Sequence, residues 1–260
     1  MKQVSDILND PCELSDRQLA EIVEHLGGLT CLPCIDAYKS SCVKRRIAAR
    51  IRRCGCRTVE QYLERLNADP NEAGRLSGSL SIHVSRFFRN GALFDVVQQS
   101  ILPSLVQSAA GRTVRFWSVG CSAGQEPYSL AILLTESFGA EAAQDRFEIL
   151  ATDIDSGMLQ LAERGWYDEL ALQGISPERR ERFFTAVGQG MQLRDEVRRL
   201  VRFCRMDLLQ TDQYLPADLV LCRNTLIYFN RPAQEKILHA FADILLRSEE
   251  HTSELQSPNT

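Results

Sequence analysis

Two short polar segments, each placed directly after an apolar run, carry residue types that suit the binding of a nucleoside. Residues 114–119 are β-branched and aromatic, and they run into a turn that contains Gly120 and Gly124. Residues 147–152 are equally apolar and end in Asp153. Glycine lets a backbone come close to a ligand, and an acid at the tip of the second parallel strand accepts hydrogen bonds from ribose hydroxyls. The pattern predicts a site for a nucleoside-containing cofactor.

The acids after the second strand have another interpretation. Asp153 or Asp155 would cap the helix predicted over residues 156–164, because a carboxylate accepts hydrogen bonds from the first backbone N–H groups of a helix. We assign Asp153 to the ribose and Asp155 or Ser156 to the cap.

The elements that position these residues alternate between strand and helix. Pro127 suits the first turn of a helix that extends to Phe138, so the unbonded N–H groups of that helix face the glycine turn. Strands are also predicted over residues 201–204 and 217–222, and parallel strands of an open α/β sheet gather ligands at their carboxyl ends. Further helices are predicted over residues 156–164, 176–184 and 230–246, the last with Asn230 as its N-cap.

The first ninety or so residues have a helical pattern instead. Between residues 37 and 53 the apolar side chains recur at helical spacing, at Val43, Ile47, Ile51 and Cys54. Arg46, Arg50 and Arg53 form an adjacent basic stripe, although the whole chain has a net charge of -4. The stripe is either a solvated helix face or a docking surface for an acidic helix.

Several separated motifs, in order, resemble those of the CheR-type chemotaxis protein methyltransferases. These enzymes use S-adenosylmethionine (SAM) to methylate glutamate side chains of chemoreceptors. The likeness runs from about Tyr38 to Leu246, and its motifs cover residues 86–89, 119–129, 151–155, 163–167 and 223–229. The family usually has Asn and Thr where this chain has His83 and Ser85, and a second Glu at Gln125.

The resemblance implies a fold and a set of site residues. The fold is α/β, a class I SAM-methyltransferase (Rossmann-like) domain preceded by a small all-helical domain. Arg89 and Tyr228 are the candidates for holding the substrate carboxylate. The candidates for SAM binding are His83, Ser85, Arg89, Gly120, Glu126, Asp153, Asp207, Leu208, Arg223 and Asn224. Asp207 and Leu208 occupy the family's adenine-contact position, although an acid there equally caps a turn. The basic helix is implied to dock the acidic receptor.

The chemistry implied for such a site needs no general base, since a glutamate carboxylate is already ionised at neutral pH. The enzyme has to orient the carboxylate oxygen and exclude water. Two alternatives have the same fold: a catalytically inactive SAM-binding signalling adaptor, and a methyltransferase acting on nucleic acid. A hydride-transferring dinucleotide enzyme is disfavoured, because the first turn lacks the G-x-G-x-x-G spacing.

Composition and charge limit the kinds of domain and partner that the chain can have. The 260 residues are 44% hydrophobic, which is enough to bury two modest cores. We expect a cytoplasmic monomer without membrane insertion, since no apolar run approaches the roughly 20 residues of a membrane helix. The net charge argues against general nucleic-acid binding. We expect a chemoreceptor-type substrate and no metal.

Nine cysteines, an odd number, are expected to be free thiols in a reducing compartment. Zinc is the alternative for the cluster at Cys31, Cys34, Cys42, Cys54 and Cys56, since C-x-x-C spacing suits tetrahedral thiolate ligation. Against zinc, the second pair is C-x-C.

The expected domains are a helical domain over residues 1–85 and a methyltransferase domain over residues 86–246. Residues 247–260 are expected to be a non-native tail, because their sequence resembles the translation of a sequencing adapter. A domain without the family's last strands would expose an apolar sheet edge. We therefore expect the chain as written to be poorly stable and weakly active.

Overall fold

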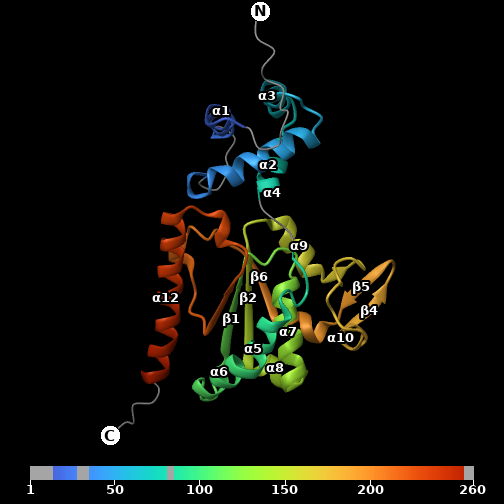
Figure 1. Ribbon diagram of the computed structural model, residues 1–260. Coiled ribbons are helices and arrows are strands. Elements are labelled where there is room, and N and C mark those ends of the chain that lie inside the picture. The colour runs from blue at the N-terminus through green and yellow to red at the C-terminus, as the bar shows by residue number, and fades with distance from the viewer. Residues whose placement is uncertain (1–13, 28–34, 81–84, 255–260) are drawn as a thin grey trace, which may run out of the picture. The chain divides into compact units, whose positions relative to one another are not determined.

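The computed structural model describes residues 14–27, 35–80 and 85–254. The chain forms two compact units. The helical unit comprises Met1–Ile82 and Ile227–Gln234, and the sheet unit comprises His83–Leu226 and Glu235–Thr260. The two units are described separately below (Figure 1).

In its described residues, the helical unit has four short α-helices around one apolar core. They are α1 (Asp16–Gly27), α2 (Ser40–Arg53), α3 (Val59–Ala68) and α4 (Glu72–Leu80), with a 3-10 turn at η1 (Ile35–Ala37). The predicted apolar face of α2 is confirmed, since Val43, Ile47 and Ile51 are buried in the core and Cys54 packs against it. Helix α3 starts where the sequence provides an N-cap, because the side chain of Thr58 accepts a hydrogen bond from the backbone N–H of Gln61.

A buried carboxylate ties three elements of the helical unit together. Glu72 at the start of α4 is fully buried. Its oxygens accept hydrogen bonds from Arg50 Nε at 2.8 Å and Nη2 at 2.6 Å, from the Tyr62 hydroxyl at 3.0 Å, and from the Cys54 thiol at 3.3 Å. The Arg50 guanidinium holds the pKa of Glu72 down at about 2.

The arginines of the basic stripe predicted on α2 therefore differ in their surroundings. Arg50 forms an ion pair with the buried Glu72, and its side chain is only 12% exposed. It is therefore not a solvated residue, which corrects the first reading of the stripe at this position. Arg53 is exposed, as are its neighbours Arg45 and Arg52. The sequence could not separate these arginines, because Arg50 meets its partner only through tertiary packing.

A segment from far along the chain completes the helical unit. The ring of Phe229 stacks on that of Tyr38 with centroids 4.6 Å apart, and Lys39 N–H donates to the Tyr228 carbonyl at 2.9 Å. Asn230 donates to the Asp36 carbonyl at 2.6 Å. The side-chain oxygen of Asn230 also accepts a hydrogen bond from the backbone N–H of Ala233, three residues later. This bond confirms the predicted N-cap.

The sheet unit contains a parallel sheet in the order β6-β2-β1-β7. The strands are β1 (Val114–Val119), β2 (Phe147–Asp153), β6 (Val201–Arg205) and β7 (Leu219–Cys222). All four predicted strands are present, which confirms the α/β fold. The fourth begins at Leu219 rather than at residue 217. Just before it, the Asp218 side chain accepts hydrogen bonds from Arg112 and from the Arg115 N–H.

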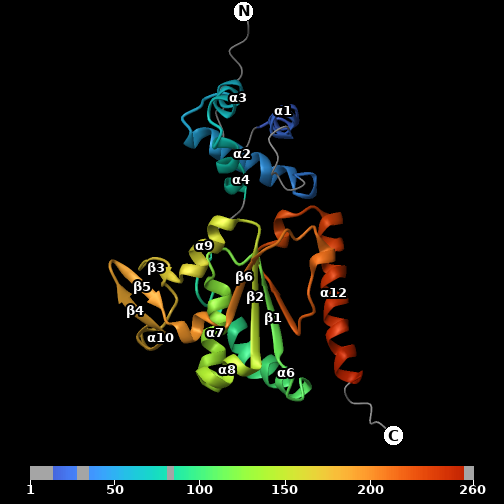
Figure 2. The same cartoon turned by 180° about the vertical axis from the view of Figure 1, so that it is seen from behind.

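Helices cover both faces of this sheet (Figures 1 and 2). They are α5 (Gly91–Val96), α6 (Leu102–Ser108), α7 (Gln125–Phe138), α8 (Ala140–Arg146), α9 (Ser156–Arg164), α11 (Asp195–Arg198) and α12 (Arg231–Glu254), with a π-helix at η2 (Val97–Ile101) and a 3-10 helix at η3 (Thr211–Gln213). A further 3-10 helix, η4 (Leu226–Tyr228), lies between β7 and α12 in the sequence. Successive strand residues point to opposite faces. Phe116 accordingly joins the core that includes α7, while Trp117 packs on Phe241 of α12 with centroids 5.4 Å apart.

Helix α12 is longer than predicted, running to Glu254 instead of Leu246. The added residues include several glutamates and an arginine, which have good helix propensity. In the part of the chain that the structure describes, no helix combines the length and the apolarity needed to cross a membrane.

A second, antiparallel sheet was missed by the sequence analysis. It has the order β3-β5-β4, from β3 (Trp166–Tyr167), β5 (Gly190–Leu193) and β4 (Phe184–Val187). Only a helix was expected over residues 176–184, and α10 (Pro177–Phe183) accounts for that part. Strands of two to four residues are too short to show a period of two, which explains the omission.

Candidate functional site

The carboxyl ends of the parallel strands bring the predicted site residues to one edge of the sheet. The register pairs Val119 of β1 with Thr152 of β2 and with Cys222 of β7. Gly120, Asp153 and Arg223, the residues that follow these three, therefore lie side by side at the same edge.

The glycine turn after β1 has the backbone that the sequence predicts. Gly120 and Gly124 have φ values of 66° and 86°, in the left-handed region where a side chain is disfavoured. A Cβ on Gly120 would also lie 2.5 Å from Thr225 Oγ1. The turn therefore requires glycine both for its conformation and for the close approach of the segment after β7.

Asp153 is almost buried, at 9% exposed, and each of its carboxylate oxygens already accepts one backbone hydrogen bond. Ser122 N–H donates to Oδ2 at 2.8 Å, and Asp155 N–H donates to Oδ1 at 3.0 Å. These bonds fix the carboxylate while leaving a second lone pair on each oxygen. The predicted cap is confirmed at Asp155, whose side chain accepts from Gly157 and Met158 at the start of α9.

Glu126 supplies a second acid at this edge. Ser118 of β1 donates its hydroxyl to Oε1 at 2.9 Å, and Arg223 donates to Oε2 at 3.4 Å. Burial raises the pKa of Glu126, while the hydrogen bond from Ser118 and the charges of Arg223 and Arg89 oppose that rise.

Two neutral polar atoms beside the glycine turn are buried without a protein partner. They are Ser122 Oγ and Gln125 Oε1, in residues that are 4% and 7% exposed. A buried unsatisfied polar atom is unfavourable unless a ligand or water pairs with it. Together with two carboxylates, this set of donors and acceptors fits a ligand that carries hydroxyls and an ammonium group, as SAM does.

The segment that carries Arg89 is held in an unusual backbone conformation. Phe88 and Asn90 have φ values of 49° and 62°, and a positive φ at a bulky residue is a real outlier. Ser129 Oγ accepts from the Phe88 N–H at 2.8 Å, and the guanidinium of Arg179 lies 4.1 Å above the Phe88 ring. Backbone strain of this kind persists where the surroundings fix it, and it concentrates at functional sites.

Asp207 and Leu208 follow β6 at the same edge of the sheet. Asp207 Oδ1 accepts from the Leu209 N–H at 3.0 Å, so the turn-capping alternative describes its observed contact. Leu208 is buried, and its carbonyl accepts from the Tyr214 hydroxyl at 2.6 Å. An adenine-binding role for the pair remains a proposal.

The other predicted residues are His83, Ser85 and Tyr228. His83 lies outside the described residues, and Ser85 is half-buried just before the Arg89 segment. Tyr228 belongs to the helical unit, where Arg46 lies over its ring at 4.8 Å. Cys31 and Cys34 of the alternative zinc cluster also lie outside the described residues.

Asn224 has a left-handed backbone, with φ of 57°, so this position has a conformational requirement apart from any ligand. Asparagine tolerates this region and glycine prefers it. We expect Asn224→Gly to keep the melting temperature within a few degrees. If the side chain also binds SAM, the same variant loses about tenfold in affinity, which corresponds to about 1.4 kcal/mol. Calorimetric titration with SAM checks this, and an unchanged affinity would restrict Asn224 to the turn.

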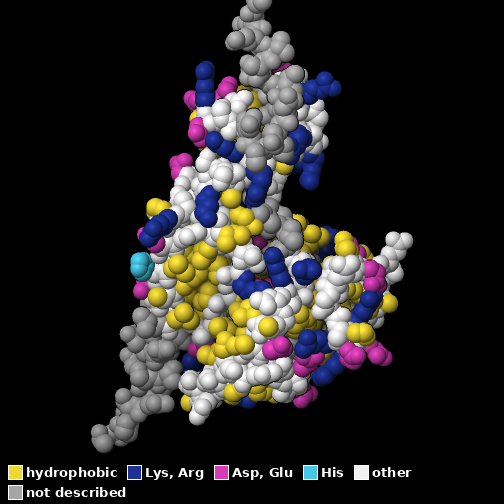
Figure 3. Space-filling view, viewed as in Figure 1, with side chains coloured by type: hydrophobic (Ala, Val, Ile, Leu, Met, Phe, Trp, Pro, Cys, Tyr) yellow, Lys and Arg dark blue, Asp and Glu magenta, His cyan; other side chains and the backbone are white. Residues whose placement is uncertain are grey.

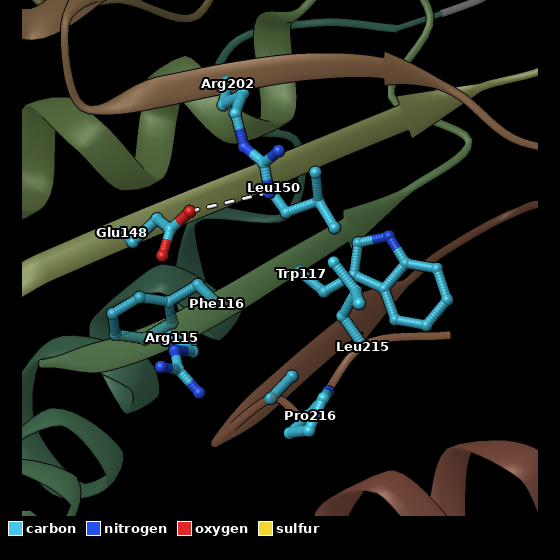
Figure 4. Close-up of a pocket in the computed structure, with 9 residues that line it drawn as sticks. Arg115, Phe116, Trp117, Glu148, Leu150, Arg202, Leu215 and Pro216 are labelled. Carbon is cyan, nitrogen blue, oxygen red and sulfur yellow. Dashed lines mark ion pairs between the residues drawn. The ribbon is translucent and has the colours of Figure 1, made fainter. Parts of the chain in front are cut away.

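One cavity of the sheet unit is separate from these residues (Figure 4). It has a volume of about 220 Å³ and lies on the Trp117 face of the sheet. Its lining includes Leu150 and Leu215, with an ion pair between Glu148 and Arg202 at 3.6 Å. Hydrophobic side chains gather on the surface of the sheet unit beside α12 (Figure 3). None of the predicted site residues lines the cavity, so it is not the candidate site.

The sequence analysis missed three residues that the structure adds to the site edge. They are Ser118, Ser122 and Thr225. A serine inside an apolar strand, one position before the last residue of that strand, is a usable signal for Ser118. Ser122 and Thr225 gave no signal beyond lying next to predicted residues.

Comparisons with known proteins show sequence similarity to one family in both units of the chain. A model described as "CheR methyltransferase, SAM binding domain" matches residues 83–249, and "CheR methyltransferase, all-alpha domain" matches residues 34–81. A "Chemotaxis protein methyltransferase" of Listeria innocua is 36% identical over 211 residues, covering 81% of this chain and 78% of that protein. A "Probable chemotaxis protein methyltransferase" of Rhizobium etli is 37% identical over 219 residues, covering 81% of each. Among solved structures, magnesium protoporphyrin IX methyltransferase from Synechocystis PCC 6803 with bound SAH has a TM-score of 0.31 and 18% identity, covering 58% of this chain and 51% of that one.

Proposed function

We propose a specific reaction for this chain from the premise that it belongs to the CheR methyltransferase family. The chain is a SAM-dependent methyltransferase of chemotaxis signalling. The proposed substrate is a chemoreceptor-type signalling protein, and the proposed product is the methyl ester of one of its glutamate side chains.

The observation that supports this proposal most is the pairing of two acids with a strained arginine segment. Asp153 and Glu126 lie at the carboxyl edge of the sheet, and the carbonyl of Arg89 is bonded to Arg223 at the same edge. The acids suit the ribose hydroxyls and the ammonium group of SAM, and the arginine suits a carboxylate.

The proposed mechanism uses orientation and charge rather than proton transfer. Bound SAM supplies an electrophilic methyl group. Arg89 binds the ionised substrate carboxylate and directs one of its oxygens toward that methyl group. Tyr228 is proposed as a second contact of the carboxylate. The planar guanidinium fork fixes the carboxylate in direction as well as position, and exclusion of water keeps its oxygen nucleophilic.

Incubation with labelled SAM and a panel of receptor cytoplasmic fragments tests the proposal. We expect label in the receptor as a base-labile ester, mapped by mass spectrometry to glutamate, and no label in a fragment whose mapped glutamates are changed to alanine. Label in nucleic acid, or SAM binding with no transfer to any fragment, would instead support one of the two alternatives.

We propose the exposed part of α2 as the receptor-docking surface. With Arg50 committed to Glu72, that part comprises Arg45, Arg52 and Arg53. We expect the double variant Arg52→Glu/Arg53→Glu to raise the KM for receptor by roughly 3–30-fold and to flatten its salt dependence, because attraction of opposite charges steers association. SAM affinity should not change.

Charge reversal at Arg17, an exposed arginine on α1 of the same unit, is the matched control. It changes the net charge in the same direction without touching α2. Equal rises of KM in both variants, or an unchanged salt dependence in the α2 variant, would count against docking through α2.

A further inference from the structure

Arg223 joins three segments that are far apart in the sequence. It follows β7, and its side chain is 19% exposed. Its Nη1 donates to Glu126 Oε2 at 3.4 Å, in the first turn of α7. Its Nη2 donates to the Arg89 carbonyl at 2.7 Å. One guanidinium therefore contacts both the acid proposed for the cofactor and the segment proposed for the substrate.

Polar and titratable side chains from several elements lie around Glu126. Ser118 of β1 donates to its other oxygen at 2.9 Å, and the positive charges of Arg223 and Arg89 favour its ionised form. The thiols of Cys121 and Cys222 also face it. Burial, together with the charge of Glu126, raises the pKa of both thiols, that of Cys222 to about 12, so they add no negative charge at neutral pH.

We infer that Arg223 is a positioning residue whose guanidinium holds the Glu126 carboxylate and the Arg89 segment at a fixed separation. The resemblance implies that Arg223 contacts SAM, and the structure adds two protein acceptors for its side chain. The inference rests on the proposed function, because Glu126 and Arg89 are proposed there to hold the two reactants. If Glu126 and the Arg89 segment are held at a fixed separation, SAM and the substrate carboxylate are already positioned for methyl transfer. Less conformational entropy then has to be lost to reach the transition state.

The geometry favours arginine over lysine at this position. The two acceptors lie on different elements, and the two terminal nitrogens of one rigid planar group reach both of them. A lysine ammonium carries the charge but sits at a single point. We therefore expect Arg223→Lys to keep most of the charge effect on Glu126 and to lose the fixed spacing.

The experiment compares Arg223→Gln and Arg223→Lys with Arg112→Gln in the full chain. Arg112 is a matched control because it is also a partly buried arginine, 28% exposed, that pairs with a carboxylate next to β7, with bonds of 2.6 and 2.9 Å to Asp218. It lies before β1, at the opposite end of the strands from the site. Removing it should lower the melting temperature without changing SAM binding.

For Arg223→Gln we expect SAM affinity to fall on the order of 10–100-fold. We also expect the pH above which SAM binds tightly to be higher in Arg223→Gln than in the parent protein. Without the arginine charge the pKa of Glu126 rises further, so the carboxylate that binds the ammonium group forms only at higher pH. Arg223→Lys should keep the pH profile near that of the parent and lower kcat on receptor more than it raises KM.

A parent-like SAM affinity and pH profile in Arg223→Gln would overturn the inference, and so would an equal loss in Arg112→Gln. If Arg223→Gln does not fold, Arg223→Lys alone tests the inference. A parent-like kcat on receptor in Arg223→Lys contradicts it, because lysine cannot hold both acceptors at a fixed separation. SAM titration needs no receptor, so absence of methyl transfer in the parent is a separate result against the proposed function.

Discussion

SAM binding is expected to fall by roughly 30- to 700-fold when Asp153 is replaced with alanine. The proposed ribose contacts are two charge-assisted hydrogen bonds, together worth about 2–4 kcal/mol. The same change also removes the acceptor of the Ser122 and Asp155 N–H groups. Those donors lie in the glycine turn and at the start of α9, so the binding surface itself should loosen. Calorimetric titration of the folded variant measures the loss.

Two companion variants separate the contributions. Asp153→Asn keeps an acceptor oxygen but no charge, and we expect an intermediate affinity. Asp155→Ala removes the helix cap two residues away, which should lower stability by about 1 kcal/mol and leave SAM affinity close to the parent value. Parent-like SAM affinity in a folded Asp153→Ala protein would refute the assignment of the ribose to this residue.

The helical unit is expected to lose about 3–5 kcal/mol of stability when Glu72 is replaced with alanine. Removing one partner of a buried ion pair leaves the other charge without compensation, and here Arg50 would be left with its side chain 12% exposed. Tyr62 and Cys54 would also lose their acceptor. A loss of this size is a large part of the stability of a small domain. Hydrogen exchange over α2, α3 and α4, together with a urea titration, measures the effect.

The pair of the exposed Asp16 with Lys44, at 2.7 Å, provides the control, since neither residue contacts Glu72. We expect Asp16→Ala to cost no more than about 1 kcal/mol, because solvent screens exposed pairs. Similar urea midpoints for the two variants would mean that Glu72 does not support the fold of this unit.

The low pKa of Glu72 also sets a pH dependence. Folding lowers this pKa from 4.5 to about 2, so the unfolded chain binds the proton more readily than the folded one. The stabilisation is fully present above pH 4.5 and declines as the pH falls toward 2. Acid titration of the parent should therefore show a loss of helical protection in that window, and Glu72→Ala should lack this part of the pH dependence.

Patterns along the chain were sufficient for features with local causes. The strands before Gly120 and Asp153 follow from apolar runs that end in a turn residue, and the caps at Asp155 and Asn230 follow from side chains that bond to backbone a few residues away. The edge where these strands end follows from parallel topology. These features require no knowledge of which distant residues meet.

Features that depend on distant partners were not accessible in this way. The sequence shows Arg46, Arg50 and Arg53 as equivalent, and only packing joins Arg50 to Glu72. The bonds of Arg223 to Glu126 and to the Arg89 carbonyl have the same origin. The left-handed backbone of Phe88 could not be predicted either, because phenylalanine avoids that conformation unless tertiary contacts impose it.

The return of residues 227–234 to the helical unit has a consequence for biosynthesis. Tyr38 and Asp36 leave the ribosome early, whereas Phe229 and Asn230 follow only after residues 83–226 have been translated. At about 5–20 residues per second, that interval lasts roughly 7–30 s. During this time the ring of Tyr38 lacks its stacking partner. The nascent helical domain therefore spends longer in an incomplete form than its position at the start of the chain suggests.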